Sequence, residues 1–234
     1  MPNRFVHLAV DAADPPVIGR FWSDLLGWPV TFEDPDETCL EGPELGIVFV
    51  PVPEPKTVKN RLHLDLAQQP GLVDRAVDLG ARPADIRQGD VPHAVLKDPE
   101  GNEFCVYEDP REKFVANTGA VAAMVFDVAD PHPLAPFWSA AMGWPVVETR
   151  PHLVFLRAPS GTGPWLALLK SDDPKQGKNR LHLDTAPLAG EDHAAEVAKL
   201  IDLGARPADV GQGDVPWTVL EDPQGNEFCV LTPR

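Results

Sequence analysis

The sequence has few cysteines, few basic side chains and no long apolar run. Its three cysteines, Cys39, Cys105 and Cys229, form no CxxC pair among 234 residues. An odd, scattered set gives no disulfide framework, so a reducing, cytoplasmic location is expected. Lysine and arginine number 20 against 36 acidic residues, for a net charge of −16. Without a basic patch, nucleic acid and anionic membranes are not expected as partners. No apolar run approaches the ~20 residues that a membrane-spanning helix needs.

Several motifs of enzyme chemistry are also missing. The sequence contains no nucleophile elbow, no P-loop, no dinucleotide-binding glycine fingerprint and no HExxH pair. Catalysis by a Ser-His-Asp triad therefore has no local support.

What the sequence does contain is an internal duplication. Residues 78–106 and 202–230 differ at only six of 29 positions. Two further blocks recur in the same order: FWSDLLGWPV at 21–30 returns as FWSAAMGWPV at 137–146, and KNRLHLD at 59–65 returns at 178–184. A repeat of roughly 115 residues is a domain and not a solenoid unit. We expect two domains, 1–112 and 119–234, with a linker at 110–118.

Each repeat shows the order β-α-β-β-β twice. Asp14 followed by two prolines predicts a helix start, and Gly27 predicts its end. Residues 61–66 alternate, with leucines on one face and Arg61, His63 and Asp65 on the other. Further helices are expected at 71–79, 134–142 and 192–203. Strands are expected at 5–10, 31–33, 38–41, 46–50, 61–66, 83–87, 93–97, 103–107, 122–128, 153–156, 166–170, 180–185, 217–221 and 227–231.

The predicted fold class is α+β, with four βαβββ modules in two paired domains. The helix of each module covers one face of a curved, mostly antiparallel sheet, and the other face is free to curve around a cavity. The aromatic residues of the two FW pairs have helical spacing and are expected in the core. The DPEGN and DPQGN segments are expected to be tight turns.

These blocks resemble the vicinal oxygen chelate superfamily, which includes glyoxalase I, bleomycin-resistance proteins and extradiol dioxygenases. The resemblance covers nearly the whole chain twice and is closest to the glyoxalase-like, bleomycin-resistance-type branch. It implies a divalent metal on the concave face, held by residues from four strands. His7 and His63 stand where the family places histidine ligands, whereas Cys105 stands where it places a glutamate. The remaining position falls near Val48 or Val50.

In the second repeat the matching positions are Ala123, His182 and Cys229, with Leu168 or Leu169 at the fourth. One histidine and one thiol are a poor metal site alone, since a metal usually needs three or more protein ligands. Sharing between the repeats is the alternative, because His7 fits His182 and Cys229 as well as it fits His63 and Cys105. The metal set that the resemblance favours is His7, His63 and Cys105, for Zn, Co, Ni or Fe.

Other polar side chains on these strands are candidates for ligand binding, each with a structural alternative. The arginines of the repeated RLHLD segment either hold structural partners or grip a ligand, and the cysteines are either reactive thiols or small buried residues. His93 and Trp217 occupy one position of the repeat, where an aromatic ring stacks on a flat ligand or lies at a half-exposed rim. The candidate ligand-binding residues are Arg61, His63, His93, Cys105, Arg180, His182, Trp217 and Cys229.

Two functions follow from this pattern. The first is a bleomycin-resistance-type protein that binds a small aromatic or amphipathic metabolite. The second is a metal-dependent lyase, isomerase or dioxygenase-like enzyme acting on vicinal oxygens, with Glu103 and Asp65 as the nearest general bases. The expected partner is a small molecule, and the chain is either a monomer with an internal pseudo-dimer or a homodimer.

Overall fold

The computed structural model describes residues 4–43, 45–85, 93–107 and 115–234. The first repeat supplies β1 (Arg4–Ala12), α1 (Pro15–Leu26), β2 (Val30–Asp34), β3 (Glu37–Gly42), β4 (Leu45–Pro51), β5 (Leu62–Leu66), α2 (Leu72–Asp78), β6 (Arg82–Pro83), β7 (His93–Lys97) and β8 (Glu103–Tyr107). The second supplies β9 (Val121–Val128), α3 (Pro131–Met142), β10 (Val146–Arg150), β11 (Leu153–Arg157), β12 (Trp165–Lys170), β13 (Leu181–Ala186), α4 (His193–Asp202), β14 (Arg206–Pro207), β15 (Thr218–Glu221) and β16 (Glu227–Val230).

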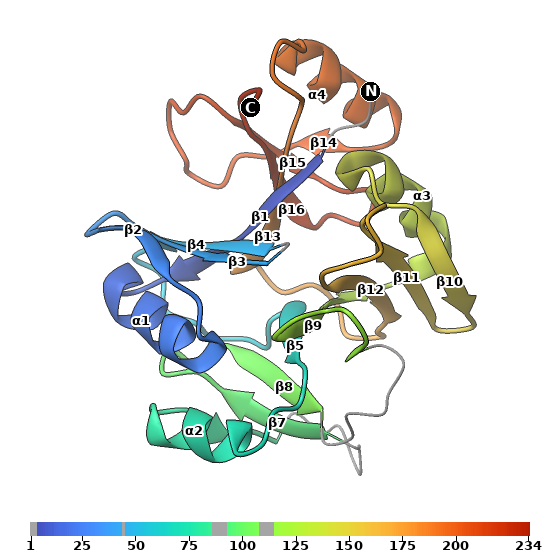
Figure 1. The fold of residues 1–234 in the computed structure, drawn as a ribbon. Coiled ribbons are helices and arrows are strands. Elements are labelled where there is room, and N and C mark those ends of the chain that lie inside the picture. Colours follow the sequence, from blue (N-terminus) through green and yellow to red (C-terminus); the bar gives the residue numbers. More distant parts are fainter. Residues whose placement is uncertain (1–3, 44, 86–92, 108–114) are drawn as a thin grey trace.

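The strands form two eight-stranded sheets, and each sheet takes four strands from each repeat. The first sheet has the order β14-β15-β16-β13-β1-β4-β3-β2, and the second has the order β10-β11-β12-β9-β5-β8-β7-β6 (Figure 1). The repeats meet along antiparallel seams, β1 with β13 and β5 with β9. The α+β fold with four βαβββ modules is therefore confirmed, with the outer modules paired in one sheet and the inner modules in the other.

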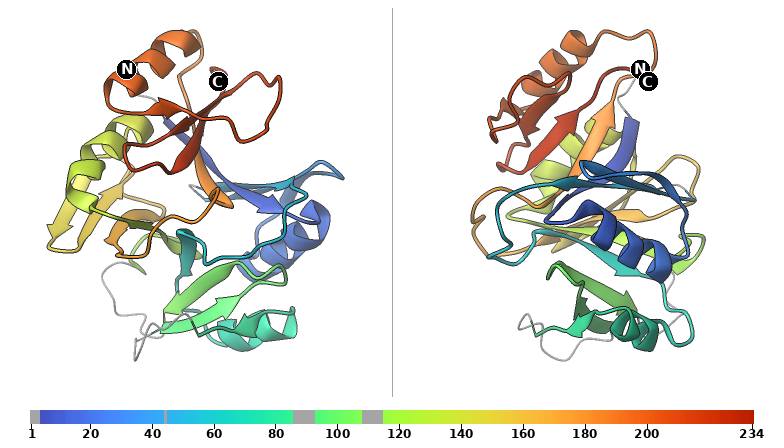
Figure 2. Two further views of the ribbon diagram at one scale, coloured as in Figure 1. Left: turned by 180° about the vertical axis from the view of Figure 1, so that it is seen from behind. Right: turned by 90° about the vertical axis from the view of Figure 1, so that its left-hand side faces the viewer.

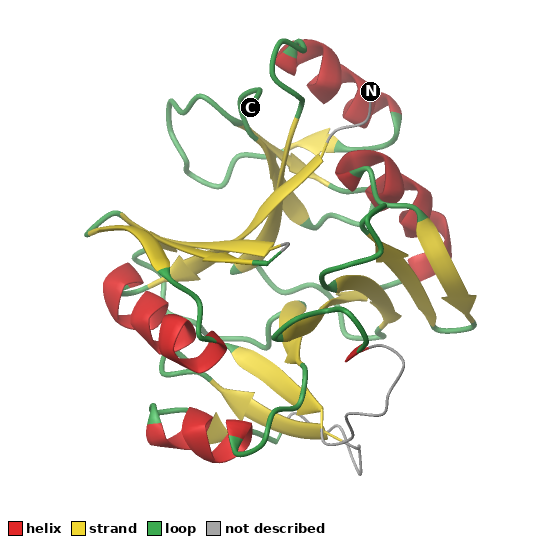
Figure 3. Ribbon diagram, in the orientation of Figure 1, coloured by secondary structure: helices red, strands yellow, loops and turns green. Residues whose placement is uncertain are grey.

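Each module is mostly antiparallel, with one parallel pair inside it. β1 runs parallel to β4, and β9 runs parallel to β12. The long helices lie between the two sheets (Figure 3). α1 packs on β3 and β4 of the first sheet and reaches β8 of the second through Trp22, and α3 packs on β11 and β12 of the second sheet and reaches β16 of the first through Trp138. The start of β1 and the C-terminal strands lie at the same end of the molecule (Figure 2), and the guanidinium of Arg4 donates to the backbone carbonyl of Arg234.

Local sequence explains where the long helices start and stop. The Asp14 carboxylate accepts a hydrogen bond from the Val17 amide at 3.1 Å, and Gly27 ends α1 with a φ of 70°. Asp130 and Gly143 do the same for α3. Glycine adopts this left-handed conformation without the steric penalty that a Cβ would add.

The FW pairs form the core, as expected. Trp22 and Trp138 are 4% and 0% exposed. Each indole donates to a buried aspartate of the repeated turn, Trp22 to Asp98 at 3.2 Å and Trp138 to Asp222 at 3.1 Å. The same turn aspartates accept backbone amides within the turn. These bonds fix each helix to the turn before the last strand of its neighbouring module.

Some expected elements differ from the structure. The strand β10 was not predicted, because its side chains are mostly exposed and show no apolar alternation. The strand predicted at 83–87 is the two-residue β6, and residues 86–87 lie outside the described residues, as does most of the predicted linker. No helix among the described residues is long and apolar enough to cross a membrane.

Candidate functional site

Polar side chains gather on one face of the first sheet, in a row that crosses both repeats. The pairing register places five residues side by side, which we call the first-sheet row: Glu41, Gly46, His7, Asp184 and Cys229. Directly paired residues project from the same face of a sheet. His182 lies one step away on that face, because it pairs with Ala9.

Asp184 is the centre of this group. Its Oδ2 lies 2.8 Å from His7 Nε2 across the seam, and its Oδ1 lies 3.5 Å from His182 Nε2. The donor atoms of His182, Asp184 and Cys229 all lie within 4.8 Å of one another. A carboxylate, two imidazoles and a thiol therefore meet on β1, β13 and β16, and no single repeat supplies all of them.

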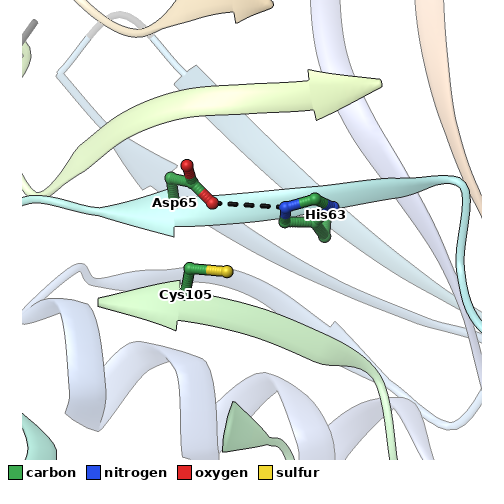
Figure 4. A group of neighbouring side chains, drawn as sticks. All are labelled: His63, Asp65 and Cys105. Carbon is green, nitrogen blue, oxygen red and sulfur yellow. Dashed lines mark ion pairs between the residues drawn. The ribbon is translucent and has the colours of Figure 1, made fainter. Parts of the chain in front are cut away.

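The second sheet carries a matching group on strands of the first repeat. His63, Asp65 and Cys105 place their donor atoms within 4.8 Å of one another, and His63 Nε2 lies 3.3 Å from Asp65 Oδ1 (Figure 4). Burial opposes ionisation of Asp65, but hydrogen bonds from His63 and Tyr107 prevail and lower its pKa below the usual value. The carboxyl group of Asp65 is therefore ionised at neutral pH.

The equivalent residues of the second sheet, which we call the second-sheet row, differ from the first-sheet row at the three positions that the second repeat supplies. This row consists of Arg157, Trp165, Ala123, Asp65 and Cys105 in the order of the first-sheet row. Ala123 replaces the histidine, Trp165 replaces the glycine, and Arg157 replaces the glutamate. Arg157 stacks on Trp165, with its guanidinium carbon 4.5 Å from the ring centroid.

Apolar side chains cover this face of the second sheet over β9, β11 and β12. Trp165 is 8% exposed and contacts Phe155 edge to face, with ring centroids 5.8 Å apart. Ala123, Val125 and Ala167 complete the cluster. Arg157 is held by the backbone carbonyls of residues 116, 117 and 163.

The metal set favoured from the sequence is divided between the two sheets. His7 lies on β1 of the first sheet, whereas His63 and Cys105 lie on β5 and β8 of the second. The reason is the pairing of modules, since β1 is completed by β13 and not by β5. The shared arrangement, left open by the sequence, is the one that the structure adopts for His7.

Burial raises the pKa of the cysteine thiol in both His-Asp-Cys groups. Burial, with the negative charge of Asp65 beside it, raises the pKa of Cys105, and burial with the charge of Asp184 raises the pKa of Cys229. Both are therefore neutral thiols at pH 7 in the absence of a metal. Burial and the acidic side chain of Glu37 raise the pKa of Cys39 to about 12.

The two repeated arginines bind loops of the opposite repeat. Arg61 Nη1 donates to the carbonyl of Asp173 at 2.9 Å, and Arg180 Nη1 donates to the carbonyl of Glu54 at 2.7 Å. They line a cavity of about 690 Å³ between the two KNR segments. Lys59 pairs there with Asp127, and Lys178 pairs with Asp11, so each repeat contributes one half of each pair.

Of the remaining predicted residues, Glu103 holds a loop, His93 lies next to the second-sheet group through Tyr107, and Trp217 is partly exposed. Both oxygens of Glu103 are engaged, Oε1 by Lys56 at 2.9 Å and Oε2 by the Asn60 amide at 3.1 Å. The His93 ring lies edge to face with Tyr107, 6.2 Å between centroids. Trp217 is 37% exposed. This partial exposure is compatible with the half-exposed rim that was the structural alternative to stacking on a ligand.

Asp184 and Tyr107 were missing from the predicted site residues. Asp184 is part of the repeated HLD segment, so its alternation with His182 was visible in the sequence. Its contact with His7 was not, because that contact depends on which modules share a sheet.

Comparisons with known proteins agree with this geometry. The family model described as glyoxalase-like domain matches residues 7–107 and again 123–231. The chain therefore belongs to the glyoxalase-like domain family. It resembles glyoxalase I from Zea mays at 15% identity and a TM-score of 0.66, over 98% of this chain and 92% of that one. It also resembles a proposed dioxygenase from Bacillus subtilis at 15% identity and a TM-score of 0.64, over 99% and 85%. At these identities the likeness concerns the fold. No curated protein matches the sequence.

Proposed function

We propose that this protein is a metal-dependent enzyme of the glyoxalase-like family that binds a small oxygen-bearing metabolite on the concave face of its first sheet. The observation that carries the proposal is the meeting of His7, His182, Asp184 and Cys229 across the seam between the repeats. The three family ligand positions His7, His182 and Cys229 belong to one sheet. Three protein ligands with an open position are typical of catalytic metal sites.

The donor set fits a borderline divalent ion such as Zn²⁺, Co²⁺, Ni²⁺ or Fe²⁺. Imidazole and thiolate suit these ions, whereas Mg²⁺ prefers a site made of oxygen ligands. Two donor atoms here, Asp184 Oδ1 and His182 Nδ1, are buried without a hydrogen-bond partner among the described residues. Leaving such atoms unsatisfied costs about 1–3 kcal/mol each, and a ligand that engages them removes that cost.

A bound ion of this kind supplies Lewis acidity toward an oxygen of the metabolite. The chain's own residues do the rest. Asp184 holds the His7 ring in place from across the seam, and the neutral Cys229 thiol gives up its proton when it becomes a ligand. The strands of the first sheet keep the donors on one face.

Metal content tests this proposal directly. Tag-free protein purified without chelator is analysed by elemental mass spectrometry, together with the variants His182→Ala and His63→Ala. We expect close to one metal ion per chain, lost in His182→Ala and retained in His63→Ala. These variants are matched, because each histidine occupies the same position of its repeat. No metal in any preparation, or loss only in His63→Ala, would contradict the proposal.

A second candidate function is metal-free binding of an aromatic or amphipathic metabolite, of the bleomycin-resistance type. The observation that favours it is the second sheet, where the polar trio of His63, Asp65 and Cys105 shares a face with the Trp165 ring, separated from it by the small Ala123. Binding pockets combine apolar and aromatic walls with a few polar groups. Quenching of tryptophan fluorescence by an aromatic metabolite, lost in Trp165→Ala and unchanged in His182→Ala, would support this function.

A further inference from the structure

We propose that only the first sheet of the two accepts the metabolite, and that Glu41 is the carboxylate that receives a hydrogen bond from it. This inference rests on the proposed function and goes beyond it by choosing one face and one contacting residue. It starts from the comparison of the two rows position by position.

The difference between the rows is largest next to the metal-ligand groups. Gly46 lies beside His7 in the first sheet, whereas Trp165 lies beside Ala123 in the second. A tryptophan side chain and the stacked Arg157 therefore occupy, in the second sheet, the space that glycine leaves open in the first. The exposures agree, since Arg157 is buried whereas Glu41, at the equivalent position of the first sheet, is exposed.

Glu41 reaches into the space above Gly46. A Cβ atom placed on Gly46 would lie 3.5 Å from Glu41 Oε1, 3.6 Å from Glu41 Oε2 and 3.3 Å from His7 Cβ. The carboxylate thus lies over the glycine, toward His7, although Glu41 and His7 stand on strands separated by β4. A methyl group at position 46 would just fit against these atoms, whereas a large side chain such as tryptophan would occupy the space that the carboxylate enters.

The Glu41 side chain is exposed, and no hydrogen bond or ion pair joins its carboxylate to any residue that the structure describes. By contrast, both oxygens of Glu103 are engaged by Lys56 and the Asn60 amide. A free carboxylate beside a metal-ligand group is an acceptor for a hydroxyl or N–H of a bound molecule. At the equivalent position of the second sheet stands Arg157, a cation that cannot accept a hydrogen bond.

The test uses cobalt(II) and acetohydroxamate, a small molecule with two adjacent oxygens and an N–H donor. Co²⁺ is first added to the metal-free protein, and the thiolate-to-cobalt absorption band reports the ligand Cys229. Acetohydroxamate is then titrated into the Co²⁺-loaded protein and followed through the visible spectrum. The variants are Glu41→Gln, Gly46→Trp and, on the second sheet, Trp165→Gly.

We expect the wild type to bind one acetohydroxamate per chain. Glu41→Gln should weaken that binding about tenfold and leave the cobalt band unchanged, because the residue contacts the probe and not the metal. Gly46→Trp, which installs the side chain of the second sheet, should abolish binding, and Trp165→Gly should leave binding at the first sheet unchanged.

Two results would overturn this inference alone: binding within twofold of wild type in Glu41→Gln with the cobalt band intact, or two acetohydroxamate molecules per wild-type chain. Absence of the cobalt band in the wild type would overturn the proposed function and this inference together. The two kinds of failure are therefore distinguished by the first step of the experiment.

Discussion

The contact between His7 and Asp184 makes a prediction about how the two repeats are held together. His7 Nε2 lies 2.8 Å from Asp184 Oδ2, and the side chains of His7 and Asp184 are 23% and 7% exposed. A hydrogen bond to a charged group contributes about 1.5–3 kcal/mol when it is well buried. Because His7 is partly exposed, we expect a coupling energy of about 1–2 kcal/mol, in the metal-free protein.

The coupling is measured by a double-mutant cycle of His7→Ala and Asp184→Asn. Urea unfolding is followed by tryptophan fluorescence and by circular dichroism on protein dialysed against a chelator. The control is a cycle of Asp184→Asn with His132→Ala, since His132 is exposed on α3 and its ring forms a hydrogen bond with the carbonyl of Pro151 at 3.2 Å, on another element than Asp184. The control pair should be additive within about 0.5 kcal/mol.

A coupling below about 0.5 kcal/mol between His7 and Asp184 would refute the reasoning. It would mean that the seam between β1 and β13 is held by its backbone ladder and apolar packing without help from the site. It would also remove Asp184 as the residue that orients His7.

Three further predictions follow from the same contacts. Metal affinity should rise about tenfold per pH unit near neutrality, because the raised pKa of Cys229 means that binding releases a proton. Competition titrations with a chromogenic chelator measure this dependence of affinity on pH, and Cys229→Ser should make it weaker. Trp138→Phe should lower the free energy of unfolding by about 2–4 kcal/mol, since it removes the indole donor to the buried Asp222. Trp22→Phe should have the same effect, because it removes the equivalent donor to Asp98. A loss below about 1 kcal/mol in urea unfolding would contradict this. Gly42→Ala should lower the free energy of unfolding by about 1–3 kcal/mol or more, because its Cβ would lie 2.2–2.4 Å from the Trp28 ring. Gly46→Ala is the control: the atom nearest to its Cβ would lie 3.3 Å away, so this variant should unfold near the wild-type midpoint.

Local elements were predictable because their signals are local. Asp14 and Gly27 marked the ends of α1, and the alternation of the RLHLD segment gave the two faces of β5 and β13. The repeated turn was recognisable from its Asp-Pro and Gly-Asn residues, and the structure shows the same indole-to-aspartate bond in both repeats. β10 was missed because an edge strand with exposed side chains carries no apolar period.

The site was only partly predictable. His7, His63, His182 and the two cysteines were identified as residues with ligand chemistry, and all of them lie on strands of the two sheets. Their grouping was not, since the metal set favoured from the sequence placed His7 with His63. Glu41 gave no sequence signal, because its role depends on a glycine across the strand pair from it.

The sequence alone therefore determined the duplication, the order of the modules and the histidines and cysteines that the two groups contain. These properties are written in residue identity and spacing, which folding does not change. The tertiary structure decided which modules share a sheet, and with it that His7 meets Asp184 while Ala123 meets Asp65. The physical reason is that strand pairing joins segments far apart in the chain. Two repeats with the same order of strands offer more than one compatible partner, and only packing of the whole molecule selects between them.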